Sequence, residues 1–298
     1  MINKGIWPTM ITPLTLEKKI DYKATEELIE WYIREGVDGI FAVCQSSEMI
    51  HLTLEERIEL SRFVVEKVNG RVSVVSSGHI SDSMEDQINE MNLMAKTGVD
   101  AIVLITNRLA KETESEEVVK KNLKILLKHL PNDIEIGFYE CPLPYKRLIS
   151  PELVNWLANQ GRFSFIKETS CDIDMIKEKL KAAEGSKIKF FNANAATLFE
   201  SLKLGAYGYN GVMANFHPKL YKKMYNLIGK DDKAAEELME FLTMASLVEN
   251  QNYPRNAKYC LNLNNVAMST VSRNPGNDLT KSQKLEIEAF NKVSKKYL

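Results

Sequence analysis

Cysteine and histidine are scarce in this sequence, with four of each among 298 residues. The cysteines lie far apart and form no C-x-x-C pair, which argues against a disulfide framework and fits reduced thiols. The formal net charge of −1 excludes an overall basic field that would attract nucleic acid or an anionic membrane. No apolar run approaches the roughly 20 residues that span a bilayer, and the first residues lack the apolar stretch of a signal peptide. We therefore expect a cytoplasmic protein with no nucleic-acid partner and no membrane partner.

Hydrophobic residues make up 44% of the chain and charged residues 27%, which is typical of a globular protein with a sizeable core. Strand-like and helix-like segments alternate eight times. The expected strands span 5–12, 39–43, 72–77, 101–105, 134–139, 163–167, 188–192 and 207–212. The expected helices span 22–35, 54–68, 84–96, 116–129, 151–159, 173–183, 197–204 and 219–228. Strict alternation predicts an α/β protein with a parallel sheet, and eight units favour a closed (β/α)8 TIM barrel over an open, doubly wound sheet.

The last part of the chain contains no strand-like segment. Three helices are expected there, at 231–251, 254–266 and 280–297. No Pro-rich or Ser-rich linker separates them from the preceding units. We therefore expect a barrel over residues 1–229 and a C-terminal three-helix region, residues 230–298, packed on the barrel.

Lys167 ends a short apolar run that begins at Phe163 and is typical of a buried strand. In a barrel, the carboxyl ends of the strands form the face that carries the chemistry. Burial disfavours the ammonium form, so the pKa of Lys167 should fall toward the range in which a neutral amine attacks a carbonyl. The alternative is a lysine that merely ends the strand and extends its amine into solvent.

Polar side chains follow several other expected strands. Tyr139 carries a hydroxyl that could move protons for an imine-forming lysine, unless it is an interfacial aromatic bonded to backbone. The turn with Ser46 and Ser47 offers hydroxyls and amides for a carboxylate, although both serines could simply form the turn. Asn194 follows the seventh strand, where it could contact a ligand or cap the next helix. Asn210 lies on the eighth strand.

Three cysteines, at positions 44, 141 and 171, follow the second, fifth and sixth strands. Three thiolates could hold zinc if they converged. Their spacing matches no zinc motif, and no histidine accompanies them. We therefore expect no metal, with a zinc-dependent aldolase as the remaining option.

On these residues, the sequence resembles the dihydrodipicolinate synthase and N-acetylneuraminate lyase family of class I aldolases along nearly its whole length. Tyr139-Glu140-Cys141-Pro142 is similar to the family's Tyr-x-x-Pro motif, which supplies the catalytic tyrosine, and Ile166-Lys167-Glu168-Thr169-Ser170 is similar to its Schiff-base lysine motif. Ser46-Ser47-Glu48 lies where the family has a turn that holds the pyruvate carboxylate. The other similar segments are Gly5…Ile11-Thr12-Pro13-Leu14, Tyr253-Pro254…Lys258 and Arg273-Asn274-Pro275. The resemblance implies a covalent imine on Lys167 and no other cofactor.

The sequence departs from the family where the second substrate is recognised. Pro144 stands where the synthases carry an arginine for the carboxylate of the aldehyde, and Lys146 or Arg147 is left as a possible replacement. Sialic acid lyases have an acidic pair where this chain has Asn194-Ala195. Gln45 replaces the first hydroxyl residue of the carboxylate-holding turn, and Ser47 replaces its second glycine.

The resemblance also implies a homodimer or a homotetramer. The family's aromatic pair after the fourth strand, which lends a tyrosine across a subunit interface, is replaced by Ile105-Thr106. This removes one functional reason for the assembly.

We therefore expect a class I aldolase or lyase that makes or breaks a carbon–carbon bond between pyruvate, or another 2-oxo acid, and an aldehyde. Gln45, Asn194 and Asn210 would contact the aldehyde, and their amides favour a neutral, hydroxylated or sugar-derived molecule. The alternatives are dihydrodipicolinate synthase (4-hydroxy-tetrahydrodipicolinate synthase) of lysine biosynthesis and a non-catalytic descendant that binds a 2-oxo acid.

Overall fold

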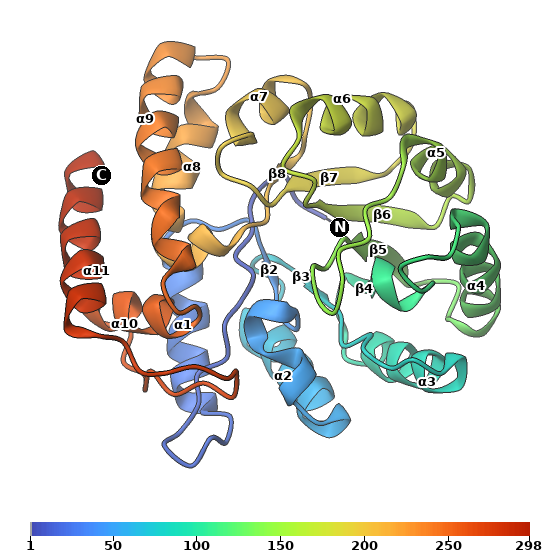
Figure 1. Ribbon diagram of the computed structural model, residues 1–298, viewed down its shortest axis with the longest axis horizontal. Coiled ribbons are helices and arrows are strands. Elements are labelled where there is room, and N and C mark those ends of the chain that lie inside the picture. The colour runs from blue at the N-terminus through green and yellow to red at the C-terminus, as the bar shows by residue number, and fades with distance from the viewer. Residues whose placement is uncertain (1) are drawn as a thin grey trace.

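Eight parallel strands form a single sheet in the computed structural model, which describes residues 2–298 (Figure 1). Seven adjacent pairs are hydrogen-bonded ladders in the order β1-β8-β7-β6-β5-β4-β3-β2. A parallel bridge between Thr9 and Phe41 joins the two ends of this order and closes the barrel. The predicted TIM barrel is confirmed, and the open doubly wound sheet is excluded. The strands are β1 (Gly5–Ile6), β2 (Gly39–Phe41), β3 (Ser73–Ser76), β4 (Ala101–Ile105), β5 (Glu135–Tyr139), β6 (Phe163–Glu168), β7 (Lys189–Asn192) and β8 (Gly208–Tyr209).

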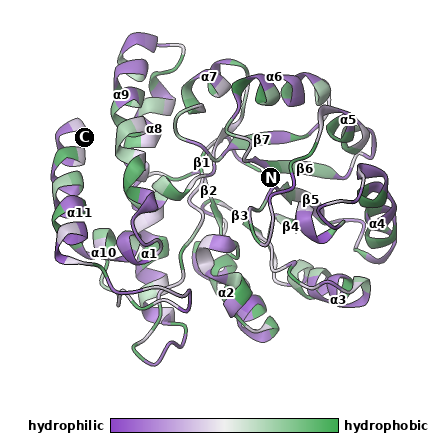
Figure 2. Cartoon of the chain, in the orientation of Figure 1, coloured by the Kyte–Doolittle hydropathy of each residue, from purple (hydrophilic) through white to green (hydrophobic). Residues whose placement is uncertain are grey.

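One helix follows each strand and lies outside the barrel (Figure 1). Hydrophilic and hydrophobic residues alternate along these helices, as expected when one face of each helix packs on the sheet (Figure 2). None of the helices formed by residues 2–298 is both long and apolar enough to cross a membrane. The helices are α1 (Tyr22–Arg34), α2 (Leu54–Val68), α3 (Met84–Ala95), α4 (Glu116–His129), α5 (Pro151–Asn159), α6 (Ile173–Ala182), α7 (Leu198–Lys203) and α8 (Pro218–Leu227).

Aromatic side chains fill the interior of the barrel. The ring of Trp7 lies 5.1 Å from that of Phe191 and 5.7 Å from that of Phe165, centroid to centroid. Gly39 on β2 leaves the space for Trp7, because a Cβ atom at this position would lie 2.3 Å from the indole ring. The interior is therefore a packed core, and a substrate can be bound only above it, at the carboxyl ends of the strands.

Two strands are shorter than the sequence suggests. The strand expected over 5–12 ends at Ile6, because Pro8 cannot donate a backbone hydrogen bond to a neighbouring strand. The strand expected over 207–212 ends at Tyr209, and the chain then enters the 3₁₀ turn η4 (Val212–Asn215). Both differences leave more irregular backbone at the carboxyl face of the barrel.

The C-terminal region consists of α9 (Asp232–Ala245), the 3₁₀ turn η5 (Ser246–Asn250), α10 (Arg255–Leu263), α11 (Lys281–Ser294) and the short turn η6 (Lys295–Tyr297). The helix expected over 231–251 is wrong in its second part, because the chain tightens into η5 after Ala245. In Figure 1, α9, α10 and α11 lie together on the side of the barrel formed by α1 and α8. The elements η5 and η4 are in contact, so this region reaches the carboxyl face of the barrel.

Candidate active site

Lys167 and Tyr139 lie side by side at the carboxyl ends of β6 and β5. The two residues are direct partners in the parallel β5–β6 ladder, so their side chains point to the same face of the sheet. The Lys167 Nζ atom lies 4.4 Å from the centroid of the Tyr139 ring and 5.9 Å from that of Phe41. Both side chains are buried, with Lys167 only 5% exposed. The lysine therefore does not extend into solvent.

Burial controls the protonation of both groups. It lowers the pKa of Lys167 from 10.5 to about 8, against the opposing influence of Cys44, Cys141 and Glu249. At pH 7 this raises the neutral fraction of the amine from about 0.03% to about 10%. Burial also raises the pKa of Tyr139 well above its ordinary value, so its phenol keeps its proton. The arrangement thus pairs a partly neutral amine with a protonated hydroxyl.

Gln45 connects the β2 end of the site to Tyr139. Its carboxamide Oε1 accepts a hydrogen bond from the Tyr139 hydroxyl at 3.3 Å and faces the Cys141 thiol at the same distance. Gln45 opens the 3₁₀ turn η1 (Gln45–Ser47), which follows β2. The structure therefore brings three of the predicted residues, Lys167, Tyr139 and Gln45, into one cluster.

The two serines of η1 have different surroundings. The Ser47 hydroxyl accepts from the Cys44 amide at 2.7 Å and donates to the Cys44 carbonyl at 2.6 Å, so it stabilises the turn itself. The Ser46 hydroxyl donates to Thr9 Oγ1 at 3.0 Å. The first amides of a 3₁₀ turn precede its first internal hydrogen bond and can bind an anion. A carboxylate at this turn would thus meet the backbone around Ser46 rather than the Ser47 hydroxyl.

A buried carboxylate fixes η1 to the C-terminal region. Glu48, which follows η1, accepts hydrogen bonds from the Ser272 hydroxyl at 2.8 Å and from the Asn274 amide at 2.8 Å. It also forms an ion pair of 3.3 Å with Lys258, whose pKa burial lowers to about 8. The segments around Lys258 and Arg273, whose sequences resemble the C-terminal region of the family, therefore stabilise the turn η1 beside the site.

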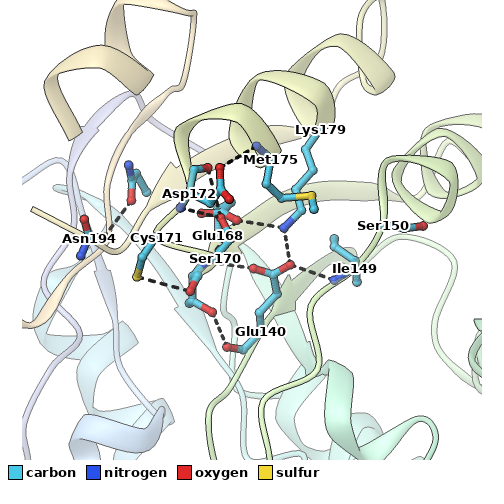
Figure 3. Close-up of polar contacts among 12 residues, drawn as sticks. Glu140, Ile149, Ser150, Glu168, Ser170, Cys171, Asp172, Met175, Lys179 and Asn194 are labelled. Carbon is cyan, nitrogen blue, oxygen red and sulfur yellow. Dashed lines mark hydrogen bonds and ion pairs between the residues drawn. The ribbon is translucent and has the colours of Figure 1, made fainter. Parts of the chain in front are cut away.

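The residues that follow Tyr139 and Lys167 point away from the site and form a second buried cluster. Lys179 of α6 lies between Glu140 and Glu168, at 2.6 Å and 2.9 Å from their carboxylate oxygens (Figure 3). Burial and the neighbouring Glu168 raise the pKa of Glu140, whereas the two carboxylates raise the pKa of Lys179 despite its burial. Glu140 also accepts from the Thr169 amide at 2.8 Å. This cluster joins the ends of β5 and β6 and thereby holds Tyr139 and Lys167 in register.

The two asparagines proposed to contact the aldehyde are already engaged. The Asn194 side-chain oxygen accepts from the Thr197 amide at 3.0 Å and thereby fixes the turn before α7, although Thr197 rather than Asn194 is the N-cap residue. The side-chain Nδ2 atom of Asn210 donates to the Trp7 backbone carbonyl at 2.9 Å and joins the end of β8 to the end of β1. The Asn210 oxygen is buried and has no hydrogen-bond partner among residues 2–298.

Arg147, one of the two possible replacements for the missing arginine, has its hydrogen-bond partners in the backbone. Its guanidinium donates to the backbone carbonyls of Lys111 and Glu114, in the segment before α4. Pro144 and Lys146 are exposed at the rim, where Lys146 interacts electrostatically with Cys171. In this structure the Arg147 guanidinium is thus engaged by backbone carbonyls.

The three cysteines do not form a metal site. Cys44 and Cys141 are buried, whereas Cys171 is exposed. Within the described part of the chain, no group of three or more His, Cys, Asp or Glu side chains is placed to hold a metal ion. His79, for example, is bonded to Gln87 at 2.8 Å and is part of the core.

Some polar groups near Lys167 do not lie at the end of a strand, so they were not identified from the sequence. Glu249 of η5 interacts electrostatically with Lys167, yet it comes from the C-terminal region rather than from a strand end. Tyr253 accepts a hydrogen bond from Asn215 at 3.1 Å and lies beside Thr9 and Ser46. The sequence feature that could have indicated this segment is the polar run Glu249-Asn250-Gln251-Asn252, which directly precedes Tyr253-Pro254.

The chain is similar to proteins of one family along nearly its whole length. The model of the dihydrodipicolinate synthetase family matches residues 3–293. The chain belongs to this family. It is 28% identical to the 4-hydroxy-tetrahydrodipicolinate synthase of Methanococcus maripaludis (strain S2), over 96% of each chain. It is 30% identical to the enzyme of that name from Methanocaldococcus jannaschii, over 87% of this chain and 88% of the relative.

A solved structure gives the same fold. YagE, a prophage protein of the dihydrodipicolinic acid synthase family from E. coli K12, crystallised in complex with pyruvate, superposes with a TM-score of 0.88. The alignment covers 98% of each chain at 22% identity. The two proteins therefore share the barrel fold.

Family membership confirms the predicted enzyme class. Enzymes of this family are pyruvate-dependent class I lyases that use a covalent Schiff base with a lysine and need no metal or other cofactor. The chain is accordingly an enzyme of this class, acting on small molecules of the 2-oxo acid and aldehyde type. This result stands against the non-catalytic descendant. The roles of individual residues and the identity of the aldehyde remain predictions.

Proposed function

We propose that this protein is a class I aldolase in which Lys167 forms an imine with pyruvate and joins it to, or releases from it, a neutral hydroxylated aldehyde. The observation that supports this most is the buried Lys167 amine beside the Tyr139 ring, at 4.4 Å. A lysine with a pKa of about 8 is neutral often enough at physiological pH to act as a nucleophile.

The reaction follows from this pair. The neutral Lys167 amine adds to the C2 carbonyl of pyruvate, and loss of water from the adduct gives the imine. Removal of a C3 proton gives the enamine, which attacks the aldehyde carbon and forms the new carbon–carbon bond. Water then hydrolyses the product imine and regenerates the amine. Tyr139 is the group within reach to carry protons in these steps, because its hydroxyl stays protonated and bonded to Gln45.

The pyruvate carboxylate would bind at η1. The backbone amides at the start of this turn supply the donors, and the Ser46 hydroxyl joins them by rotating away from Thr9, to which it donates in the absence of a ligand. Ser47 has an indirect part in this proposal, because its hydroxyl maintains the turn.

A neutral aldehyde is favoured by what surrounds the second half of the site. Pro144 supplies no charge where a synthase has its arginine, and Arg147 is held by backbone carbonyls elsewhere. Gln45 presents an amide, a group that hydrogen-bonds hydroxyls without demanding a charged partner. Asn210 carries an unpartnered buried oxygen at the end of β8.

Dihydrodipicolinate synthase itself is the second candidate, because the curated relatives from both methanogens bear that name. It requires an aldehyde that carries a carboxylate, L-aspartate 4-semialdehyde. Of the two candidate cations near the rim, only the exposed Lys146 remains for that carboxylate.

Turnover with matched aldehydes tests the proposal. Purified protein and Lys167→Arg are compared by pyruvate consumption with D-glyceraldehyde, D-erythrose and L-aspartate 4-semialdehyde. The proposal predicts that kcat/KM is highest for a hydroxylated aldehyde and that the variant has no activity. Preference for the semialdehyde would establish the synthase instead. Turnover by Lys167→Arg would reject the imine mechanism.

The assembly is a further expectation, a homodimer or a homotetramer. A monomeric dihydrodipicolinate synthase variant, 18% identical, shares this fold with a TM-score of 0.89, so the fold does not require assembly. Light scattering coupled to size-exclusion chromatography gives the mass directly, and about 34 kDa per particle would exclude the oligomer.

A further inference from the structure

Glu249 belongs to a rigidly held segment at the carboxyl face of the barrel. It lies in η5, which contacts η4 at the end of β8. The carbonyl of the preceding residue, Val248, accepts from the Gln251 amide at 3.1 Å and from the Asn256 side chain at 2.7 Å. Asn256 is fully buried in α10. The backbone around Glu249 is therefore fixed rather than a freely moving loop.

The electrostatic neighbours of Glu249 indicate which part of the carboxyl face it occupies. They include Lys167 at the end of β6, Cys171 just before α6 and Tyr253 just before α10. Tyr209 at the end of β8 and Tyr221 of α8, whose rings stack at 4.4 Å, are also among them. Together with the contact between η5 and η4, this places the carboxylate at the carboxyl face, near the ends of β6 and β8.

This carboxylate is half-buried and makes no hydrogen bond or ion pair within residues 2–298. Burial raises its pKa, and the attraction of Lys167 works in the opposite direction. A carboxylate that has lost part of its hydration without gaining protein donors carries a free-energy cost. Donors from a bound ligand would remove that cost.

We propose that Glu249 is a specificity-determining residue that accepts a hydrogen bond from a hydroxyl group of the aldehyde positioned beside the Lys167 imine. This inference rests on the proposed function and adds the group that selects the aldehyde. It selects in two ways, because a hydroxyl gains a charge-assisted hydrogen bond and a carboxylate at the same place is repelled. The favoured class is a neutral polyhydroxylated aldehyde.

The same carboxylate weakens the case for an aldehyde that bears its own carboxylate. Such a substrate would meet Glu249 without the arginine that Pro144 replaces.

The test compares wild-type protein with Glu249→Gln, which keeps size and shape but removes the charge. Glu240→Gln, on the exposed face of α9, is the matched control. Two readouts are measured, the rate of borohydride trapping with pyruvate alone and kcat/KM with pyruvate and either D-glyceraldehyde or glyoxylate. Loss of one charge-assisted hydrogen bond predicts a fall of about 10- to 100-fold with glyceraldehyde in Glu249→Gln. Activity with glyoxylate should stay equal or rise, and Glu240→Gln should behave as wild type.

Trapping with pyruvate alone separates this inference from the proposed function. If Glu249 selects the aldehyde, Glu249→Gln still traps pyruvate, at a rate equal to wild type or higher, because the lost carboxylate favoured the unreactive ammonium form of Lys167. Retained trapping also shows that the variant is folded. A parallel loss of trapping would assign Glu249 to the lysine rather than to the aldehyde and would overturn the inference. Equal losses with both aldehydes, or no loss with either, would also overturn it. Absence of trapping in the wild type would instead reject the proposed function.

Discussion

Replacing Lys179 with methionine tests whether the buried cluster behind the site holds it together. The substitution keeps the length and apolar body of the side chain and removes its charge. Glu140 and Glu168 would then remain buried, at 0% and 1% exposure, without the cation that lies within 3 Å of both. Glu140 directly follows Tyr139 of β5, and Glu168 directly follows Lys167 of β6. Any relaxation of the two carboxylates therefore moves Tyr139 and Lys167.

The expected loss follows from how the two carboxylates can respond. Protonating one carboxyl group at pH 7, from an ordinary pKa near 4.3, costs about 4 kcal/mol. Removing one partner of a buried ion pair costs about 3–5 kcal/mol in measured cases. We therefore expect Lys179→Met to lower the free energy of unfolding by about 3–5 kcal/mol at pH 7.

Urea unfolding followed by circular dichroism measures this free energy. The matched control is Lys187→Met, which removes an ion pair of 2.7 Å with Glu135 whose side chains are 44% and 41% exposed. Exposed pairs contribute about 0–1 kcal/mol, so the control should change little.

The pH dependence of the stability difference tests the same explanation independently. Without Lys179, burial and repulsion by Glu168 raise the pKa of Glu140 above its unfolded value, with no cation to oppose them. Stability from such groups is present at low pH and is lost as pH rises through the folded-state pKa. The difference between wild type and Lys179→Met should therefore shrink as pH falls from 7 to 5. A loss below about 1 kcal/mol at pH 7, equal to that of the control, would refute the proposed role.

Four further predictions concern the site itself. Because burial lowers the pKa of Lys167 to about 8, borohydride trapping should accelerate with pH and level off above about 8, and a midpoint near 10.5 would contradict this. The same lowered pKa penalises the folded state at all pH values below about 8, so Lys167→Met should raise the free energy of unfolding at pH 7 by up to about 3 kcal/mol in urea titrations. Tyr139→Phe should lower kcat by about 10²- to 10⁴-fold with an unchanged urea midpoint, and a kcat within about twofold of wild type would remove Tyr139 from the proton path. Glu48→Gln leaves Lys258 buried without an anion, so we expect a loss of about 3–5 kcal/mol and a higher KM for pyruvate, and a wild-type KM would show that η1 does not depend on this anchor.

Helix ends with local signals were predictable from the sequence. The helices over 54–68, 116–129 and 151–159 have the expected bounds. Thr53 and Glu56 form a reciprocal capping box, and Ser150 caps α5 ahead of Pro151. Such interactions join residues three apart, so the pattern is visible without knowledge of the fold.

Features set by distant contacts were not predictable. The helix after residue 231 stops at Ala245 with no glycine or proline to end it, and the turn that follows is held by Asn256 from another helix. The double role open to Asn194, ligand contact or cap, depends on where Thr197 lies. Sequence patterns carry no information on such tertiary choices.

In the candidate site, too, some residues could be predicted from the sequence and others could not. Lys167 and Tyr139 could be proposed because the carboxyl ends of parallel strands meet at one face, and the β5–β6 register indeed pairs them. Glu249 could not be found by this rule, because it reaches the site from a turn between two C-terminal helices. Arg147 seemed available in the sequence, but its guanidinium is bound by carbonyls near α4.

Borohydride reduction in the presence of pyruvate tests the central claim most directly, because it converts the imine into a stable secondary amine. Intact-mass and peptide analysis should show a single three-carbon adduct on Lys167, absent from Lys167→Arg and from protein reduced without pyruvate. An unmodified Lys167, or an adduct on another lysine of the well-folded protein, would contradict the account.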